Sequence, residues 1–342
     1  MDQYGHAVAA ETDIDLDAVA AHFQRRADAE QRVLGRVTHR RPVGDDERRV
    51  ERGIVRHRRT RARLVGREAH VRNEDIAETF NLSGAAYEQS APELINLAAS
   101  ELIKRLNLQA DSDLVDLGCG PGAVIAHAAP LLTRGSAVGA DLSRVQLELA
   151  RDRFRRAVLA PRFIQEDAAA TGLRDRSASA VSLGFVLPYA ERPLLLLKEA
   201  TRLTRLGGRV AATVIGSPFF GSAGTRLLGH LERRGVVRPD VEMRFDPREA
   251  VRLALLSEND ERRLDDVTIE EIEREFWWDS FDDWWGMLDA FGFLPTDRER
   301  MIEAIAGELR EDDRVVDPDG QVRCPVKIWL LSATVCEGDP WL

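Results

Sequence analysis

The first chemical feature of the sequence is a set of three glycines on alternate positions. Gly118, Gly120 and Gly122 follow Asp116 in the segment LVDLGCGPGA, residues 114–123, directly after a short apolar run. A glycine-rich loop between a strand and a helix lets backbone N–H groups and the helix N-terminus approach a ligand closely. The pattern therefore predicts a binding loop with a carboxylate beside it.

The glycine spacing also bears on which ligand would bind. Folds that bind dinucleotides use G-x-G-x-x-G and place phosphates over the helix, whereas the spacing here is G-x-G-x-G. The carboxylate of Asp116 would repel a pyrophosphate, but it suits a cationic amino-acid group. S-adenosylmethionine carries such an ammonium group and a sulfonium, so this chemistry favours S-adenosylmethionine over a nicotinamide cofactor.

Histidines offer few candidates for a general base. Residues 73–342 contain two of them, His127 and His230. His127 falls within the helical pattern after the glycine loop, where we expect it to pack. His230 could face a substrate, which makes it a candidate catalytic residue, although a lone histidine is more often structural.

Composition is that of an ordinary globular protein. Of the 342 residues, 44% are hydrophobic and 31% are charged, enough to build a sizeable core. No run of about 18 apolar residues occurs, so we expect neither a membrane span nor a signal peptide. Cys119, Cys324 and Cys336 lack metal-ligand spacing, so we expect no metal site. Their small, odd number predicts reduced thiols and a cytoplasmic location.

Alternating strand and helix patterns place these residues. Short apolar runs, separated by helical patterns, occur at 113–117, 136–140, 162–166, 180–186 and 209–215. Parallel strands joined by crossover helices explain this order, because the strands of a covered parallel sheet read as continuous apolar runs. The sequence therefore predicts an α/β sandwich with the glycine loop at the end of its first strand.

Two later segments break this alternation. DDVTIEEIEREFWW, residues 265–278, is predicted to be a long strand. RVVDPDGQVRCPVKIWLLSATV, residues 314–335, is predicted to be a hairpin turned at Asp319–Gly320, whose second arm would complete the sheet. Capping signals predict two helix starts, at Ser90 with Glu93 and at Ser280 with Asp283.

Three motifs resemble those of class I S-adenosylmethionine-dependent methyltransferases. VDLGCGPG, residues 115–122, is similar to the first motif of that family, and GADLS, 139–143, and IQEDAAA, 164–170, follow in the family's order. The resemblance covers about residues 75–335 and is strongest over 114–215. It implies a Rossmann-like three-layer sandwich with a mostly parallel seven-stranded sheet ending in an antiparallel hairpin strand, plus a helical cap.

The resemblance also implies roles for individual residues. Asp141 matches the position that hydrogen-bonds the cofactor ribose, and Asp167 the position that contacts the adenine amine. Residues 185–189 would lie near the transferred methyl group, although FVLPY is not the Asp/Asn-Pro-Pro-Tyr signature of base and glutamine methylation. The residues expected to bind the cofactor are Tyr87, Asp116, Gly118, Gly120, Gly122, Asp141, Leu142, Asp167, Ala168 and Phe185, and the candidate catalytic residues are His230 and Tyr189.

Within that family the order of elements is most similar to the small-molecule group, which includes quinone-biosynthesis and natural-product enzymes. In that group the segment around FNLSGAAYEQ, residues 80–89, is an N-terminal lid, which would lay Tyr87 over the cofactor. Cap insertions are expected at about 216–263 and 279–314. The aromatic residues there and nearby would wall a substrate pocket or pack the cap onto the sheet: Phe219, Phe220, Trp277, Trp278, Phe281, Trp284, Trp285 and Phe291.

Charge divides the chain unevenly. Residues 32–72 contain fourteen arginines and have a net charge of +9, whereas residues 73–342 have a net charge of −14. The Arg-rich stretch at residues 39–70 has few large apolar residues and no clean period, so we expect residues 1–72 to be an Arg-rich leader that is disordered or loosely helical. It could be an arm for RNA or an acidic partner, or it could be dispensable.

These patterns together predict S-adenosylmethionine-dependent methyl transfer to an apolar or aromatic small molecule, in secondary metabolism or quinone-type biosynthesis. An RNA methyltransferase that uses the Arg-rich arm is one alternative, and a non-catalytic cofactor-binding protein is another. The acidic charge of residues 73–342 counts against nucleic acid as a partner. The acceptor atom and the oligomeric state are open at this point.

Overall fold

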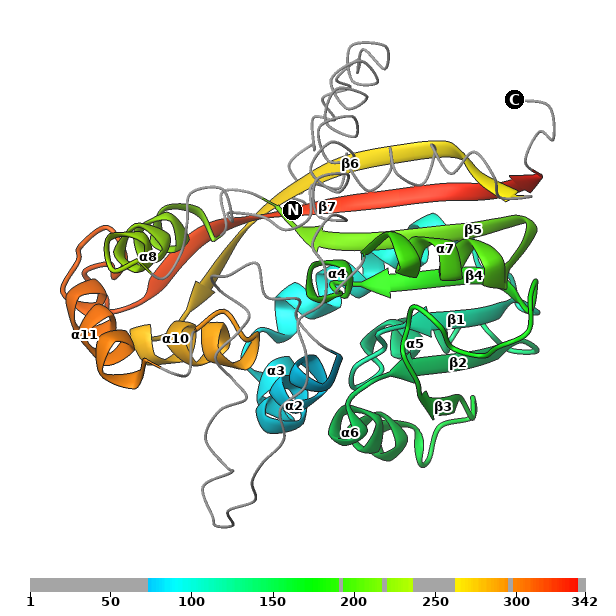
Figure 1. Ribbon diagram of the computed structural model, residues 1–342, viewed down its shortest axis with the longest axis horizontal. Coiled ribbons are helices and arrows are strands. Elements are labelled where there is room, and N and C mark those ends of the chain that lie inside the picture. Colours follow the sequence, from blue (N-terminus) through cyan, green and yellow to red (C-terminus); the bar gives the residue numbers. More distant parts are fainter. Residues whose placement is uncertain (1–72, 191–192, 217–219, 236–261, 295–297, 338–342) are drawn as a thin grey trace, which may run out of the picture. The chain divides into compact units, whose positions relative to one another are not determined.

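Seven strands of the described residues form a single mixed sheet (Figure 1). The computed structural model describes residues 73–190, 193–216, 220–235, 262–294 and 298–337. The strand order is β3-β2-β1-β4-β5-β7-β6. The first five strands pair in parallel, and β7 pairs antiparallel with both β5 and β6. The strands are β1 Asp113–Leu117, β2 Ser136–Asp141, β3 Arg162–Gln165, β4 Ala178–Gly184, β5 Thr204–Ile215, β6 Arg262–Trp278 and β7 Val322–Glu337.

Helices cover both faces of this sheet and extend beyond it. They are α2 Asn73–Ser83, α3 Ala86–Gln89, α4 Pro92–Leu106, α5 Ala123–Ala128, α6 Arg144–Phe154, α7 Pro193–Leu203, α8 Gly221–Arg233, α10 Phe281–Ala290, α11 Glu299–Arg310 and the short 3₁₀ helix η1 Leu187–Tyr189. In β1, Leu114 joins a core with α4 and α5, whereas Val115 and Leu117 join a core with α7. This alternation, normal for a strand, gives the predicted three-layer sandwich and confirms the fold class.

Two local expectations differ from the structure. Ser90 is not the N-cap of α4, because it still closes α3 and its hydroxyl donates to the Tyr87 carbonyl (3.3 Å). Helix α4 instead begins after Ala91, with no side-chain cap. In contrast, Ser280 caps α10 as predicted, since its Oγ accepts from the Asp283 N–H (3.1 Å).

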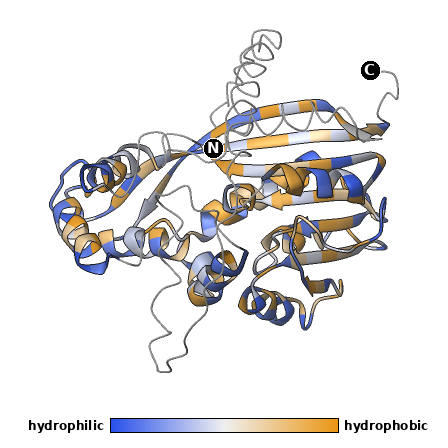
Figure 2. Ribbon diagram, viewed as in Figure 1, coloured by the Kyte–Doolittle hydropathy of each residue, from blue (hydrophilic) through white to orange (hydrophobic). Residues whose placement is uncertain are grey.

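The hairpin predicted within residues 314–335 is also wrong in its first arm. The Asp319–Gly320 turn forms, and the Gly320 N–H donates to the Asp317 carbonyl (2.9 Å). Residues 314–318 are not a strand, however, and β7 pairs with β6 from Trp278↔Val322 to Arg262↔Glu337. A five-residue strand at 314–318 could form hydrogen bonds with only part of β7, whereas β6 pairs with β7 along its whole length. Figure 2 shows hydrophilic residues interspersed along β6.

The cap is described in part. Helix α8 lies in the first predicted insertion and packs against β7 and α11, while α10 and α11 lie in the second. Residues 236–261 of the first insertion, together with Phe219 and the predicted leader 1–72, lie outside the described residues. Within the ranges described, no helix is long and apolar enough to cross a membrane.

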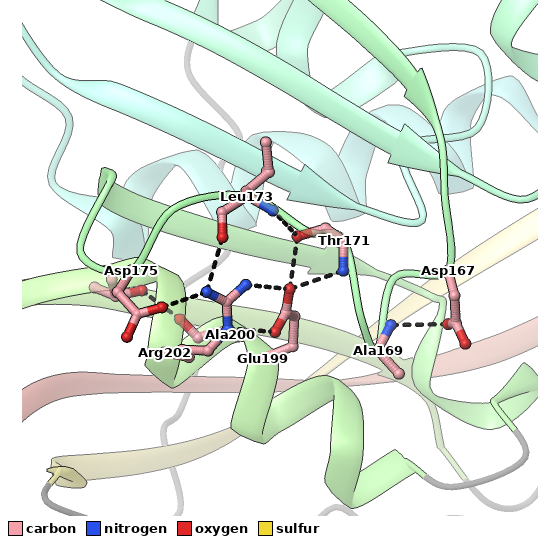
Figure 3. A network of polar contacts seen from close by, with 9 residues as sticks. Asp167, Ala169, Thr171, Leu173, Asp175, Glu199, Ala200 and Arg202 are labelled. Carbon is pink, nitrogen blue, oxygen red and sulfur yellow. Dashed lines mark hydrogen bonds and ion pairs between the residues drawn. The ribbon is translucent and has the colours of Figure 1, made fainter.

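A polar network anchors the loop between β3 and β4 to α7 (Figure 3). Glu199 accepts hydrogen bonds from the Thr171 N–H (2.9 Å) and hydroxyl (2.6 Å), and its carboxylate pairs with Arg202 (2.7 Å). Arg202 also donates to the Leu173 carbonyl (2.8 Å) and to Asp175 (2.5 Å). Burial would raise the pKa of Glu199, but the bonds from Arg202 and Thr171 hold that pKa below its usual value. The same loop carries Asp167.

We expect Glu199→Ala to lower the free energy of unfolding by about 2 kcal/mol, because Thr171 and the half-buried Arg202 lose their acceptor. Urea denaturation at pH 7 measures the change. Glu148→Ala is the matched control, since Glu148 pairs with Arg144 on the surface (3.6 Å) and should cost less than about 0.5 kcal/mol. Equal losses in the two variants would show that the network does not anchor the loop.

Candidate functional site

A cavity of about 310 Å³ lies at the carboxyl-terminal ends of β1, β2 and β4 and beneath α2 and α3. We call residues 73–89, which contain these two helices, the lid. Ligands of parallel α/β sheets bind at this edge. Ten of the predicted residues line the cavity: Tyr87, Asp116, Gly118, Gly120, Asp141, Leu142, Asp167, Ala168, Phe185 and Tyr189.

The glycine loop has the conformation that its sequence predicts. Gly118 has φ +70°, and a Cβ on it would lie 2.3 Å from a methyl carbon of Val186. Gly122 has φ +83° and precedes α5, where a Cβ would lie 3.2 Å from the Phe154 ring. Gly122 is not among the cavity-lining residues, so its part is to shape the loop and let the start of α5 lie close against α6.

Asp116 is the most deeply buried acid of the cavity, with 1% of its surface exposed. Its Oδ1 accepts from the Ser182 hydroxyl (2.6 Å), while Oδ2 has no hydrogen-bond partner within the described ranges. Burial raises the pKa of Asp116 to about 7, the Ser182 bond lowers it, and the charge of Asp141 raises it further. An unpaired carboxylate oxygen at a cavity suits a cationic donor on a ligand.

Asp141 ties the end of β2 to the glycine loop. Its Oδ2 accepts from the Gly120 N–H and its Oδ1 from the Ser143 N–H, both at 2.8 Å. Burial raises the pKa of Asp141, and these two backbone bonds oppose that shift. Because an ionised carboxylate offers about four acceptor positions, both oxygens can still accept from vicinal hydroxyls.

Asp167 has one partner that the sequence did not predict. Its Oδ1 accepts from the Ala169 N–H (2.8 Å), and its Oδ2 from the side-chain amide of Asn73 (2.7 Å). Asn73 lines the cavity from the first residue of α2. No local pattern could reveal this pair, because the two residues are 94 positions apart in the chain.

Aromatic rings close the cavity on the lid side. Phe80 meets Tyr87 (5.5 Å between ring centroids) and Tyr189 (5.1 Å) edge to face. The Tyr189 hydroxyl donates to the Phe291 carbonyl (3.0 Å). Burial raises the pKa of both tyrosines well above the usual value, so both remain neutral phenols near pH 7.

His230 does not reach this cavity. It lies on α8, with its Nδ1 2.8 Å from Glu308, and Arg234 bonds the same Glu308. Burial and the charge of Arg233 lower the pKa of His230. These contacts join α8 to α11, so the structure gives His230 a structural role and leaves it away from the cavity.

The described cap aromatics do not form the cavity wall, although the Phe291 ring packs behind it against Tyr87 (4.6 Å between ring centroids). Phe220, Trp278, Trp284 and Phe291 are buried in the main core, and the Trp278 indole donates to the Ser90 carbonyl (3.0 Å). None of the described cap aromatics lines the cavity. The aromatic residues that line the cavity come from the lid and from the segment at the end of β4. Within the same described ranges, no group of residues could hold a metal ion.

Comparison with known proteins identifies the domain that carries this cavity. Residues 115–212 match the family described as "Methyltransferase domain". Methyltransferase GfsG of Streptomyces halstedii is 31% identical over 127 residues, which cover 32% of this chain and 40% of GfsG. The alignment thus spans well under two thirds of that relative's length. The family match confirms the resemblance to class I S-adenosylmethionine-dependent methyltransferases.

Solved structures of low sequence identity are also similar. The YcgJ protein of Bacillus subtilis is 17% identical, with a TM-score of 0.49 over 71% of this chain and 99% of YcgJ. The geranyl diphosphate C-methyltransferase of Streptomyces coelicolor A3(2), solved with Mg²⁺, geranyl diphosphate and S-adenosyl-L-homocysteine, is 18% identical. Its TM-score is 0.45 over 77% of this chain and 97% of that enzyme.

The raised pKa of Asp116 predicts a pH-dependent cost of folding. The pKa of this carboxyl is 3.8 in the unfolded chain and about 7 in the folded protein, so the folded state loses stability as pH rises between these values. In Asp116→Asn this loss disappears, and the stability of the variant relative to wild type should improve by about 2–4 kcal/mol from pH 4 to pH 8. Urea denaturation at both pH values measures it. A difference that does not vary with pH would show an ordinary pKa.

Proposed function

We propose that this chain, whose residues 115–212 match a methyltransferase domain, transfers the methyl group of S-adenosylmethionine to an apolar or aromatic small molecule. The observation that carries the proposal is the line of three acids, Asp116, Asp141 and Asp167, along one cavity. Each offers acceptors to one polar region of S-adenosylmethionine: the ammonium, the ribose hydroxyls and the adenine amine. The unpaired Oδ2 of Asp116 supports the fit most directly.

The protein's own part in this reaction would be orientation and the exclusion of water. Bound S-adenosylmethionine supplies an electrophilic methyl group on a sulfonium. The acids hold the ligand's polar ends, while the lid covers the cavity with Phe80 and Tyr87. Alignment of this kind is worth about 7–11 kcal/mol in well-oriented reactions, so few catalytic side chains are needed. Tyr189 would lie beside the acceptor as a neutral hydroxyl rather than as a base.

The lining of the cavity supports an apolar acceptor. Beyond the acids it is mostly aliphatic and aromatic, including Ile76, Ile95, Leu102, Leu195 and Leu196. Such walls favour flat or hydrocarbon bodies. The net charge of −14 over residues 73–342 would oppose polyanions, which argues against an RNA acceptor. A non-catalytic cofactor-binding protein is the second candidate, and it would bind S-adenosylmethionine without turnover. The three free cysteines suit the reducing cytoplasm.

Cofactor binding should depend on Asp141. S-adenosylmethionine should bind more tightly than NAD, and Asp141→Ala should lose about 1.5–3 kcal/mol of affinity, the scale of hydrogen bonds to a charged group. Titration calorimetry measures both. Asp152→Ala, which removes an exposed acid of α6, is the control and should bind as wild type does. Tighter binding of NAD would overturn the cofactor assignment.

The acceptor class is tested by methyl transfer. We expect turnover with phenolic or quinone-like acceptors and none with RNA or a phosphorylated isoprenoid, measured by transfer of a labelled methyl group. Asp141→Ala serves as the variant in which the signal should drop. Efficient turnover of a polyanion with no phenolic accepted would contradict the substrate class, and binding without any turnover would favour the non-catalytic candidate.

A further inference from the structure

A glutamine on α6 links the cavity to the lid. Gln146 is 1% exposed and lines the cavity. Its Nε2 donates to two main-chain carbonyls, those of Phe80 (3.1 Å) and Gly84 (2.9 Å). Both carbonyls lie at the C-terminal end of α2: the Phe80 carbonyl also accepts from the Gly84 N–H (3.2 Å), and the Gly84 carbonyl lies just past the last residue of the helix. Gln146 therefore caps the lid from a different helix.

The oxygen of the same side-chain amide, Oε1, lacks a hydrogen-bond donor within the described residues. Oε1 of Gln146 is buried and has no hydrogen-bond partner in the part of the chain that the structure describes. Because both donors are used on the lid, only the acceptor is left. A buried acceptor without a donor destabilises the free protein, so a ligand that brings a hydroxyl to this point gains affinity.

A second side chain fixes the lid to the same loop. Oδ1 of Asn81 accepts from the Ser143 hydroxyl (2.8 Å) and from the Val145 N–H (3.2 Å). The Ser143 N–H in turn donates to Asp141 (2.8 Å). The lid is thus bonded to the segment 141–146, which carries the acid expected at the ribose.

These contacts determine where the lid's aromatic rings lie. Phe80 and Gly84 bracket the end of α2, and the Phe80 ring contacts Tyr87 and Tyr189. All three rings line the cavity. If the C-terminal end of α2 shifted relative to α6, these rings would move with it. The cavity wall that would face the substrate, the acceptor of the methyl group, would therefore change position.

We propose that Gln146 is a positioning residue that couples cofactor occupancy to lid closure. Its Oε1 accepts a hydrogen bond from a ribose hydroxyl of the cofactor, while its Nε2 holds the end of α2. The inference rests on the proposed function, because S-adenosylmethionine or its demethylated product is the ligand. With Oε1 engaged by the ligand, the Gln146 side chain is fixed at both ends of its amide, so the end of α2 that Nε2 anchors is held more firmly than without the ligand.

Four variants, two at Gln146 and two at Asn81, separate the parts of this link. Gln146→Met removes donor and acceptor with similar shape, and Gln146→Glu keeps the acceptor but loses the donors. Asn81→Leu breaks the neighbouring contact, and Asn81→Asp restores its acceptor. S-adenosylhomocysteine is the probe, with its Kd from calorimetry and the amide hydrogen exchange of residues 76–90 from mass spectrometry.

We expect Gln146→Met to raise the Kd about tenfold. In wild type and Asn81→Asp, saturating S-adenosylhomocysteine should slow exchange across residues 76–90. In both Gln146 variants and in Asn81→Leu this ligand-induced protection should be lost even at saturation, which a general loss of stability would not produce. Gln109→Met is the control, because Gln109 donates to the Asn107 carbonyl at the opposite end of β1 (3.1 Å).

The outcomes distinguish this inference from the function on which it rests. If wild type binds S-adenosylhomocysteine and Gln146→Met binds within twofold with full protection of the lid, the inference is wrong and the proposed function stands. If wild type fails to bind, the proposed function is wrong and the inference is wrong with it. If Gln146→Met does not fold, Gln146→Glu decides by the same readout: loss of lid protection at saturation supports the inference, and full protection overturns it.

Discussion

Burying the carboxylate of Asp116 costs free energy, because the group leaves water for the interior of a sheet. Ser182, its register partner on β4, satisfies one oxygen, so that cost depends on the parallel pairing of β1 with β4. The glycine loop that follows can come close only because Gly118 has no Cβ to meet Val186. One carboxylate therefore constrains three things: the register of β1 with β4, the conformation of the glycine loop, and the charge of the ligand that can bind beside it.

Each of the other two acids has one partner in its own loop, Ser143 for Asp141 and Ala169 for Asp167, and one partner from outside it. Asp141 is oriented by the Gly120 and Ser143 N–H groups, and Asp167 by Asn73 of the lid. The Glu199–Arg202 network fixes the loop after β3 from the side of α7. Acceptors positioned in this way need little rearrangement when a ligand binds, which is how a rigid scaffold prepares a site.

The sequence could predict those parts of the site that short motifs near the ends of strands encode. Asp116 lies near the end of β1, Asp141 ends β2 and Asp167 comes two residues after β3, and these three acids line the cavity together with Gly118 and Gly120. Asn73, Gln146 and Ser182 were missed because each acts on a residue at least 60 positions away. His230 was misplaced because its helix, α8, packs on α11 instead of the cavity.

The outer edge of the sheet has a consequence for encounters between copies. Strand β6 is the last in the order, and its exposed acids are Asp265, Asp266, Glu270, Glu271, Glu273 and Glu275. A long edge strand offers unpaired backbone groups on which another chain could add a strand. Glu270 pairs with Arg105, and Glu271 and Glu273 pair with Lys327. Acids still outnumber basic residues along the strand, so two copies meeting along β6 would bring like charges together, which disfavours strand addition there.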